Sequence, residues 1–262
     1  MREFVDRRAL KAESRALLAN AQVSPKAMVA LYLGLLLALN LVDLLAGASG
    51  LLSTFVYILT SLMALVLQAG FILYCMAVRR GERAELLTLF DEFSFAGKVI
   101  LLKLAIFCLV AAWSLLFLIP GVIAAYRYRF ALPNLCEKPE LGVMEALALS
   151  RRQTMGFKWP LFLLDLSYLG WSLLASLPVL FYQSFIAHGV IQNSVGQLVG
   201  GMAGIAASLA SLPAPFWVLF AGLWQLVVSL FYYAQFQCTE LGYFELAKQA
   251  ARAPGPDGLG GL

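Results

Sequence analysis

The chain has 262 residues, of which 61% are hydrophobic and 13% are charged, and its formal net charge is +4. A soluble domain is typically about 45–50% apolar and about 25% charged. The composition therefore excludes a soluble globular protein and predicts an all-α, polytopic membrane protein. The basic residues cluster beside apolar segments, which is typical of cytoplasmic loops and argues against nucleic acid as a partner.

The first 22 residues are predicted to form a basic amphipathic helix. Arg8, Lys11 and Arg15 recur at helical spacing, and leucines lie between them. A helix with one basic face and one apolar face is suited to the anionic phospholipids of the inner leaflet. The same pattern also permits a solvated helix without lipid contact.

Six apolar segments are predicted to cross the membrane. A helix needs about 20 residues to cross a hydrocarbon core about 30 Å thick. The predicted spans are residues 27–46, 51–78, 99–119, 121–136, 159–181 and 214–236. The fourth is short, about 24 Å at 1.5 Å per residue, and would need local thinning of the bilayer or support from neighbouring helices.

Two segments between the spans are predicted to be short helices at the membrane surface. Residues 85–93 carry four large apolar residues at positions i, i+3, i+4 and i+7, namely Leu86, Leu89, Phe90 and Phe93. That spacing gives a helix one apolar stripe, so the segment is expected to lie flat at the interface. Residues 140–155 are helical by composition and end in basic residues.

Residues 117–130, FLIPGVIAAYRYRF, predict a hairpin between the third and fourth spans. Pro120 and Gly121 suit a turn, because proline removes a helix hydrogen bond and glycine tolerates a sharp bend. A turn there leaves every basic loop on one side of the membrane. One long span over residues 99–129 would instead put the basic segment 138–158 outside, against the positive-inside rule.

The distribution of lysine and arginine also predicts the orientation of the chain. These residues occur before the first span, after the second, after the hairpin and in the tail, whereas segments 47–50 and 183–194 hold none. Both termini are therefore expected in the cytoplasm, in a multi-pass protein of the cytoplasmic membrane.

Two arginines of the fourth predicted span would lie at bilayer depth, where charge is costly. Arg127 and Arg129 are two positions apart, so on a helix they point about 200° apart. Arg129 and Asp165 are expected at similar depths and are predicted to form an ion pair. Arg127 could face a wet cavity, lipid headgroups or a substrate. Alternatively, both arginines extend to the interface without another role.

The segment before the last span has no clear assignment. Gly196, Gly200 and Gly204 repeat every four residues, a spacing that lets two membrane helices pack closely. Residues 194–212 could therefore be a seventh span or a glycine-rich outer loop. Residues 1–248 are expected to form a single domain, followed by a disordered Pro/Gly-rich tail over 249–262.

No residue pattern predicts a catalytic, cofactor or metal site. The four cysteines form no C-x-x-C pair, and His188 is the only histidine. No nucleophile motif accompanies them. The protein is therefore expected to have no cofactor and no enzymatic activity.

Several short sequences carry a resemblance to a known family. They are DRRALKAESRALLAN (6–20), QAGF (68–71), FDEF (90–93), LIPGV (118–122), EALALSRRQTMGFKWPLF (145–162), LSYLGW (166–171) and FYYAQF (231–236). In this order they resemble an uncharacterised bacterial integral membrane family, domain of unknown function nine-seventy-five. The resemblance covers roughly residues 1–181 and the last block, and it implies a multi-span helical protein with no established activity. The longer, Gly/Ala-rich segment 183–215 departs from the family.

A second resemblance rests on the IPG turn, the Tyr/Arg-bearing span after it and the EAL…S…G-W segment. These features are similar to the membrane region fused to some bacterial glycerophosphodiester phosphodiesterases. The sequence does not contain the hydrolase half of those enzymes, so no catalytic residue is carried over.

Two functions remain open from the sequence. The first is a non-enzymatic membrane scaffold, accessory or lipid-organising module, supported by the interfacial segments. Its partners would be the lipid bilayer and its anionic phospholipids. Other membrane proteins or a second copy of the chain are possible further partners. The alternative is a transporter or permease for a small solute or anion, supported by Arg127, Arg129 and Asp165 at the bilayer midplane.

Overall fold

The computed structural model describes residues 7–47, 50–195 and 214–252, which form helices connected by short turns and contain no strand. Nine of the elements are α-helices and one, η1, is a 3₁₀ helix. In chain order they are α1 (Arg7–Ala19), α2 (Pro25–Leu45), α3 (Leu51–Arg80), η1 (Leu86–Phe95), α4 (Ala96–Leu116), α5 (Leu118–Arg127), α6 (Ala131–Glu137), α7 (Val143–Gln153), α8 (Lys158–Val195) and α10 (Ala214–Arg252).

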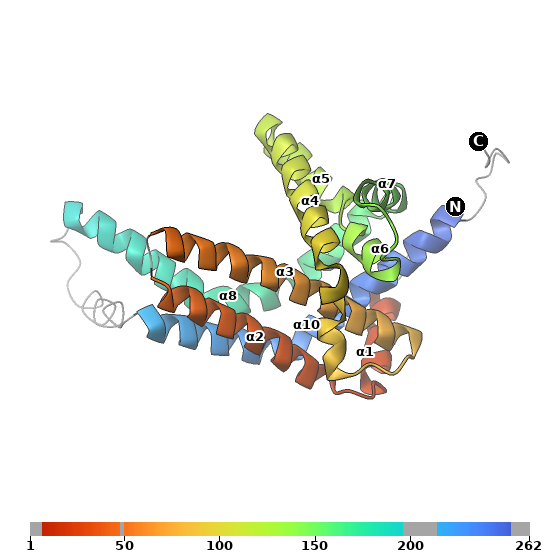
Figure 1. The fold of residues 1–262 in the computed structure, drawn as a ribbon, viewed down its shortest axis with the longest axis horizontal. Coiled ribbons are helices and arrows are strands. Elements are labelled where there is room, and N and C mark those ends of the chain that lie inside the picture. Colours follow the sequence, from red (N-terminus) through yellow and green to blue (C-terminus); the bar gives the residue numbers. More distant parts are fainter. Residues whose placement is uncertain (1–6, 48–49, 196–213, 253–262) are drawn as a thin grey trace.

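Four long helices, α2, α3, α8 and α10, lie side by side and form the main bundle (Figure 1). Helix α10 packs against each of the other three. Aromatic rings fill the centre of the bundle. Tyr32 of α2 stacks on Phe71 of α3 with ring centroids 5.0 Å apart, and Tyr233 of α10 lies 5.1 Å from the same ring. This aromatic cluster therefore forms where three helices meet.

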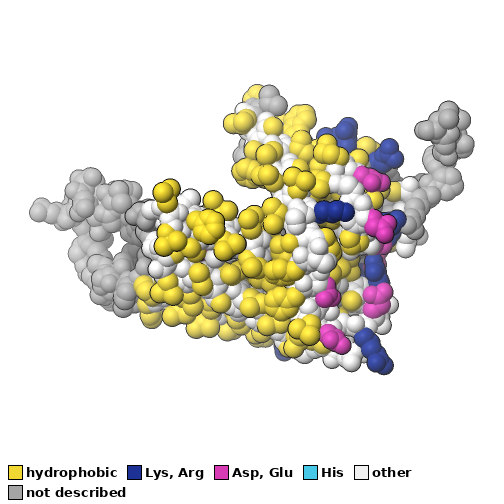
Figure 2. Space-filling view, viewed as in Figure 1, with side chains coloured by type: hydrophobic (Ala, Val, Ile, Leu, Met, Phe, Trp, Pro, Cys, Tyr) yellow, Lys and Arg dark blue, Asp and Glu magenta, His cyan; other side chains and the backbone are white. Residues whose placement is uncertain are grey.

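Short helices gather at one end of this bundle. Helices α1, α6 and α7 and the last turns of α10 lie together at the right of Figure 1. In Figure 2 the lysine, arginine, aspartate and glutamate side chains are concentrated at that end, and the rest of the visible surface is mainly apolar. The long helices thus present an apolar surface, and the charged residues mark one end of the molecule.

The apolar surface is that of a membrane protein. Leu51, Leu115 and Phe117 are 92%, 88% and 74% exposed, and soluble proteins rarely expose large contiguous apolar patches. Five helical segments of the described chain are long and apolar enough to cross a membrane. They are Pro25–Leu45, Leu51–Arg80, Leu86–Leu115, Lys158–Phe181 and Pro215–Ala251.

The predicted fourth span, residues 121–136, is not one helix. The chain instead forms the ten-residue α5 and the seven-residue α6, separated by a turn at residues 128–130. Pro133 gives the physical reason. In a continuous helix it would lack the hydrogen bond to the carbonyl of Arg129 and would clash with it. Arg129 consequently lies in a turn between helices.

The hairpin exists as α4 and α5, but its turn is at Phe117 rather than at Pro120-Gly121. Phe117 has extended backbone angles, with φ −160° and ψ 152°. Pro120 lies in the first turn of α5, where an N–H group would have no helical partner. Gly121 allows close packing, since a Cβ there would lie 2.1 Å from Ser114 Oγ on α4. In Figure 1 this hairpin leaves the main bundle steeply, so α3 and α4 diverge.

The predicted amphipathic helix after α3 is a 3₁₀ helix, η1, that packs on α3. Leu89 is fully buried, whereas Leu86, Phe90 and Phe93 are each at least 40% exposed. Gly70 explains the docking, because a Cβ at that position would lie 2.0 Å from the Leu89 carbonyl oxygen. Of the four residues in the predicted apolar stripe, Leu89 therefore packs inside the protein and the other three face the exterior.

Helix boundaries differ from prediction at both ends of the chain. Helix α10 continues to Arg252, so the start of the predicted tail over 249–262 is helical. Helix α8 runs through Val195, well past the predicted end at residue 181. In α1, Leu10 and Leu18 are buried in the protein core instead of facing lipid. Gly196, Gly200 and Gly204 lie outside the described residues, as do residues 253–262.

Candidate functional site

Arg129 lies between two carboxylates from different long helices. Its Nη1 and Nη2 atoms donate to Asp165 Oδ2 and Oδ1 of α8 at 2.5 and 2.8 Å. Its Nε and Nη2 atoms donate to Glu240 Oε1 and Oε2 of α10 at 2.7 and 3.2 Å. Both contacts are bidentate, the strongest geometry for an arginine–carboxylate pair. We call these three residues the Arg129 network.

Aromatic side chains enclose this network. The hydroxyl of Tyr126 donates to Asp165 Oδ2 at 2.6 Å. The Arg129 guanidinium lies 5.5 Å from the Tyr126 ring and 5.9 Å from the Phe236 ring. Side-chain exposure is 18% for Arg129 and 11% for Glu240, so the charges are largely removed from solvent. The turn before α6 is thereby fixed to both α8 and α10.

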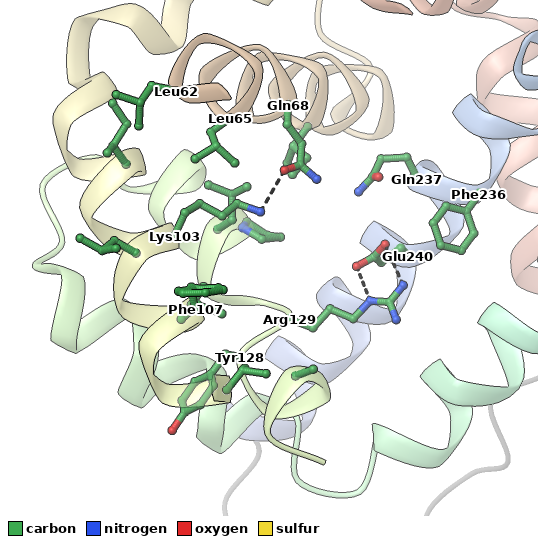
Figure 3. A pocket seen from close by; sticks show the side chains of 18 of the residues that line it. Leu62, Leu65, Gln68, Lys103, Phe107, Tyr128, Arg129, Phe236, Gln237 and Glu240 are labelled. Carbon is green, nitrogen blue, oxygen red and sulfur yellow. Dashed lines mark hydrogen bonds and ion pairs between the residues drawn. The ribbon is translucent and has the colours of Figure 1, made fainter. Parts of the chain in front are cut away.

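A fourth charge lies near the Arg129 network. Lys103 projects from the middle of α4, and its Nζ donates to Gln68 Oε1 of α3 at 2.9 Å (Figure 3). Among the described residues, no carboxylate lies within ion-pair distance of Lys103. Two carboxylates around one arginine leave one negative charge, and Lys103 balances it. The four groups together are neutral.

Lys103, Arg129 and Glu240 line the polar part of a cavity of about 870 Å³, and Asp165 lies behind Arg129, outside the lining. The cavity lies where α3 and the α4–α5 hairpin diverge, and α10 closes its back. Its polar lining includes Gln68, Lys103, Arg129, Gln237 and Glu240, and Figure 3 shows Gln237 beside the Arg129–Glu240 pair. Apolar side chains of α3 and α4 form the remaining walls, among them Leu62, Leu65, Leu104, Phe107 and Val110. Leu104 and Phe107 are 55% and 69% exposed, so the cavity opens sideways along α4.

Arg127 does not line this cavity. Its backbone carbonyl accepts hydrogen bonds from Ser150 Oγ at 2.9 Å and Thr154 Oγ1 at 3.2 Å, which attach α7 to the end of α5. Within the described part of the chain, the Arg127 guanidinium forms no hydrogen bond or ion pair. The structure therefore brings Arg129 and Asp165 together and leaves Arg127 apart from them.

A protein-family model described as "Protein of unknown function (DUF975)" matches residues 97–233, from α4 to the first half of α10. The chain belongs to this family. No curated protein and no solved structure matches the chain. The second resemblance, to the membrane region of glycerophosphodiester phosphodiesterases, stays a prediction.

The part of the chain that matches the DUF975 family contains three of these five polar residues. Lys103, Arg129 and Asp165 lie inside the matched range, whereas Gln68 and Glu240 lie outside it. Lys103 and Glu240 were not among the site residues predicted from the sequence. Lys103 could have been recognised from the sequence as a candidate site residue, because it is a charged residue in an otherwise apolar span. Glu240 could not have been recognised in this way, because the last span was predicted to end at residue 236 and α10 continues past that residue.

The site of this DUF975 protein has no constellation that resembles a metal centre. In residues 7–47, 50–195 and 214–252, no group of three or more His, Cys, Asp or Glu side chains could hold a metal ion. The carboxylates of the Arg129 network are occupied by arginine. The cavity contains both hydrogen-bond donors and acceptors, and they lie next to apolar walls.

Proposed function

We propose that the protein is a non-enzymatic, lipid-organising membrane module that binds one amphiphilic membrane molecule in the cavity between α3, α4 and α10. The observation that carries this proposal is the division of the cavity into a polar end and an apolar, laterally open remainder. A volume of about 870 Å³ lies within the roughly 300–1,000 Å³ of typical ligand pockets. A polar headgroup beside Lys103 with a hydrocarbon tail along α4 fits that division.

The charges of the cavity favour a headgroup with little net charge. Lys103, Arg129, Asp165 and Glu240 sum to zero, and an unbalanced charge in a low-dielectric site is costly. Gln68, Gln237 and Lys103 supply donors, and Glu240 and the amide oxygens supply acceptors. A neutral or zwitterionic headgroup could hydrogen-bond to these groups without disturbing the balance.

The proposed orientation places the charged end of the molecule in the cytoplasm of a bacterial cell. Helix α1 and the end of α10 both lie there (Figure 1), and Arg79 and Arg80 end α3 at the same side. Basic residues are retained on the cytoplasmic side of membranes. In this orientation the polar end of the cavity is nearer the inner leaflet, the source of the bound molecule.

A transporter for a small solute is the second candidate. The charged groups on the cavity wall favour it, because intramembrane charges often mark solute pathways. Against it, Arg129 is held by two bidentate carboxylates and is not free to bind a solute anion. The open apolar wall also suits a lipid tail better than a hydrated solute.

The proposal is tested by filling the cavity and measuring co-purified lipid. Val110→Trp would place an indole in the apolar wall, and Val227→Trp on the exposed face of α10 is the matched control. The full chain, purified in mild detergent, is expected to retain a stoichiometric lipid by native mass spectrometry. Val110→Trp should lose it and Val227→Trp should keep it. Equal lipid retention in both variants would overturn the proposal, whereas uptake of a water-soluble solute into proteoliposomes would favour the transporter.

A further inference from the structure

A second cavity lies on another side of the molecule, between α1, the turn that follows it, and α10. Its volume is about 670 Å³. Its lining includes two charged residues, Arg15 of α1 and Lys26 of α2, and both are basic. This contrasts with the first cavity, where Lys103 and Arg129 lie beside Glu240 and Arg129 is also paired with Asp165. A pocket lined by charges of one sign attracts a ligand of the opposite sign.

Nearby acidic groups do not neutralise this pocket. Glu13 is on the same helix as Arg15, but its carboxylate pairs with Arg79 Nη2 at 3.2 Å. Among the described residues, neither Arg15 nor Lys26 forms an ion pair. The two cations are therefore available to an anion from outside the chain.

The remaining lining is suited to the boundary between lipid headgroups and hydrocarbon. Gln22 and Ser24 contribute polar side chains, and Ser24 makes no capping hydrogen bond to α2. Phe231 of α10 lines the same pocket and is 64% exposed. The Lys26 Nζ lies 6.0 Å from its ring. Polar and cationic groups thus adjoin an exposed aromatic ring within one pocket.

The pocket also lies at the correct depth for a headgroup. Lys26 is the second residue of α2, the first helix that is long and apolar enough to cross the membrane. Arg15 lies on α1, which is at the charged end of the molecule. The pocket therefore spans the level at which the chain enters the hydrocarbon.

We propose that this pocket binds the phosphate of an anionic phospholipid, with Arg15 and Lys26 contacting the phosphate and Phe231 contacting the start of the acyl chains. The site is separate from the cavity of the proposed function. It would attach the α1–α2 corner to the anionic leaflet and so fix the depth of α1.

The test uses the full chain in nanodiscs of phosphatidylcholine with and without phosphatidylglycerol. We expect phosphatidylglycerol to bind preferentially, as measured by native mass spectrometry of the released protein and by a rise in thermal stability. Basic residues near a membrane surface each contribute about 1 kcal/mol to binding an anionic lipid. The double variant Arg15→Gln/Lys26→Gln should therefore bind phosphatidylglycerol about 25-fold more weakly, equivalent to about 2 kcal/mol.

Two control variants separate the pocket from general surface charge. Arg151→Gln/Arg152→Gln removes two exposed basic residues from α7 and should keep wild-type preference for phosphatidylglycerol. Arg15→Lys/Lys26→Arg keeps both charges and should also keep it. If the two glutamine double variants lose the preference equally, or if neither loses it, the site does not exist.

Two further outcomes are informative. Inorganic phosphate added to phosphatidylcholine nanodiscs should not raise thermal stability, and an equal rise would identify a soluble anion as the ligand and overturn the lipid assignment. The Val110→Trp variant should keep its phosphatidylglycerol preference. If the first cavity binds no lipid, the inference about the second pocket is unaffected. If the second pocket binds no phosphatidylglycerol, the proposal for the first cavity is unaffected.

Discussion

Replacing Arg129 with leucine removes the cation that Asp165 and Glu240 share. Both carboxylates would then face each other across an apolar side chain, and neither has another cation within ion-pair distance in the described chain. Replacing Asp165 with leucine is a different perturbation, because Arg129 keeps its two hydrogen bonds to Glu240. The structure therefore predicts unequal effects for the two partners of one ion pair.

The expected magnitudes follow from what each change leaves behind. Removing one partner of a buried ion pair costs about 3–5 kcal/mol, and Arg129→Leu leaves two largely buried carboxylates. Asp165→Leu removes hydrogen bonds to a charged group, each worth about 1.5–3 kcal/mol, but leaves Arg129 paired. The double variant Arg129→Leu/Asp165→Leu still leaves Glu240 without a cation, so only part of the loss should be recovered. Adding Glu240→Gln should recover most of the remainder.

Thermal unfolding in detergent measures the relative stability of the two single variants, the double variant and the triple variant. At roughly 2–4 °C per kcal/mol for a chain of this size, Arg129→Leu should lower Tm by roughly 6–20 °C. The exposed arginine variant Arg151→Leu is the control and should change Tm little. Simple additivity of the Arg129 and Asp165 changes would show that the two side chains do not interact. A triple variant no more stable than Arg129→Leu would show that stranded carboxylates are not the cause of the loss.

Two glycine variants test the packing of η1 and of the hairpin, and a third variant tests the role of Arg127. Gly70→Val should destabilise the protein by about 3 kcal/mol, because the valine side chain would meet the backbone of Leu89. The loss would be measured as a lower Tm and faster proteolysis at η1. Unchanged proteolysis would contradict the close approach of the two backbones. Gly121→Val should cost about 1–3 kcal/mol, and Ser114→Gly in the same chain should restore part of the Tm, since Ser114 Oγ is the atom in the way. Arg127→Leu should change stability by no more than about 0.5 kcal/mol, and a loss as large as that of Arg129→Leu would place the Arg127 guanidinium in the network.

The amino-acid sequence was sufficient to predict the class of the protein and the approximate positions of its long helices. Apolar runs of 20 residues or more must satisfy their backbone hydrogen bonds internally, and in a membrane this requires helices. Composition and run length therefore located α2, α3, α4 and the membrane parts of α8 and α10. The sequence also predicted that the chain reverses after the third span, because basic residues on both sides of that point belong on one side of the membrane. It placed the turn at Pro120-Gly121, whereas the structure places it at Phe117.

Two features of the local sequence bear on the hairpin and on the site. Pro133 favours a break between α5 and α6, although a proline does not by itself end a helix, since α8 continues through Pro178. Lys103 in an apolar span was likewise visible. Periodicity alone gave the wrong helix type for η1, because an α-helical stripe and a 3₁₀ helix cannot be separated over ten residues without the contact to Gly70.

Only the tertiary structure decided which charges meet. Arg129 and Asp165 could be matched by estimated depth, but Glu240 is 111 positions from Arg129 and lies beyond the predicted end of its span. Depth along a helix follows from counting residues, whereas the direction in which a side chain points and the neighbour it meets depend on how helices rotate and diverge. The same divergence of α3 from the α4–α5 hairpin creates the cavity of about 870 Å³, and no local pattern in the sequence encodes an angle between two helices.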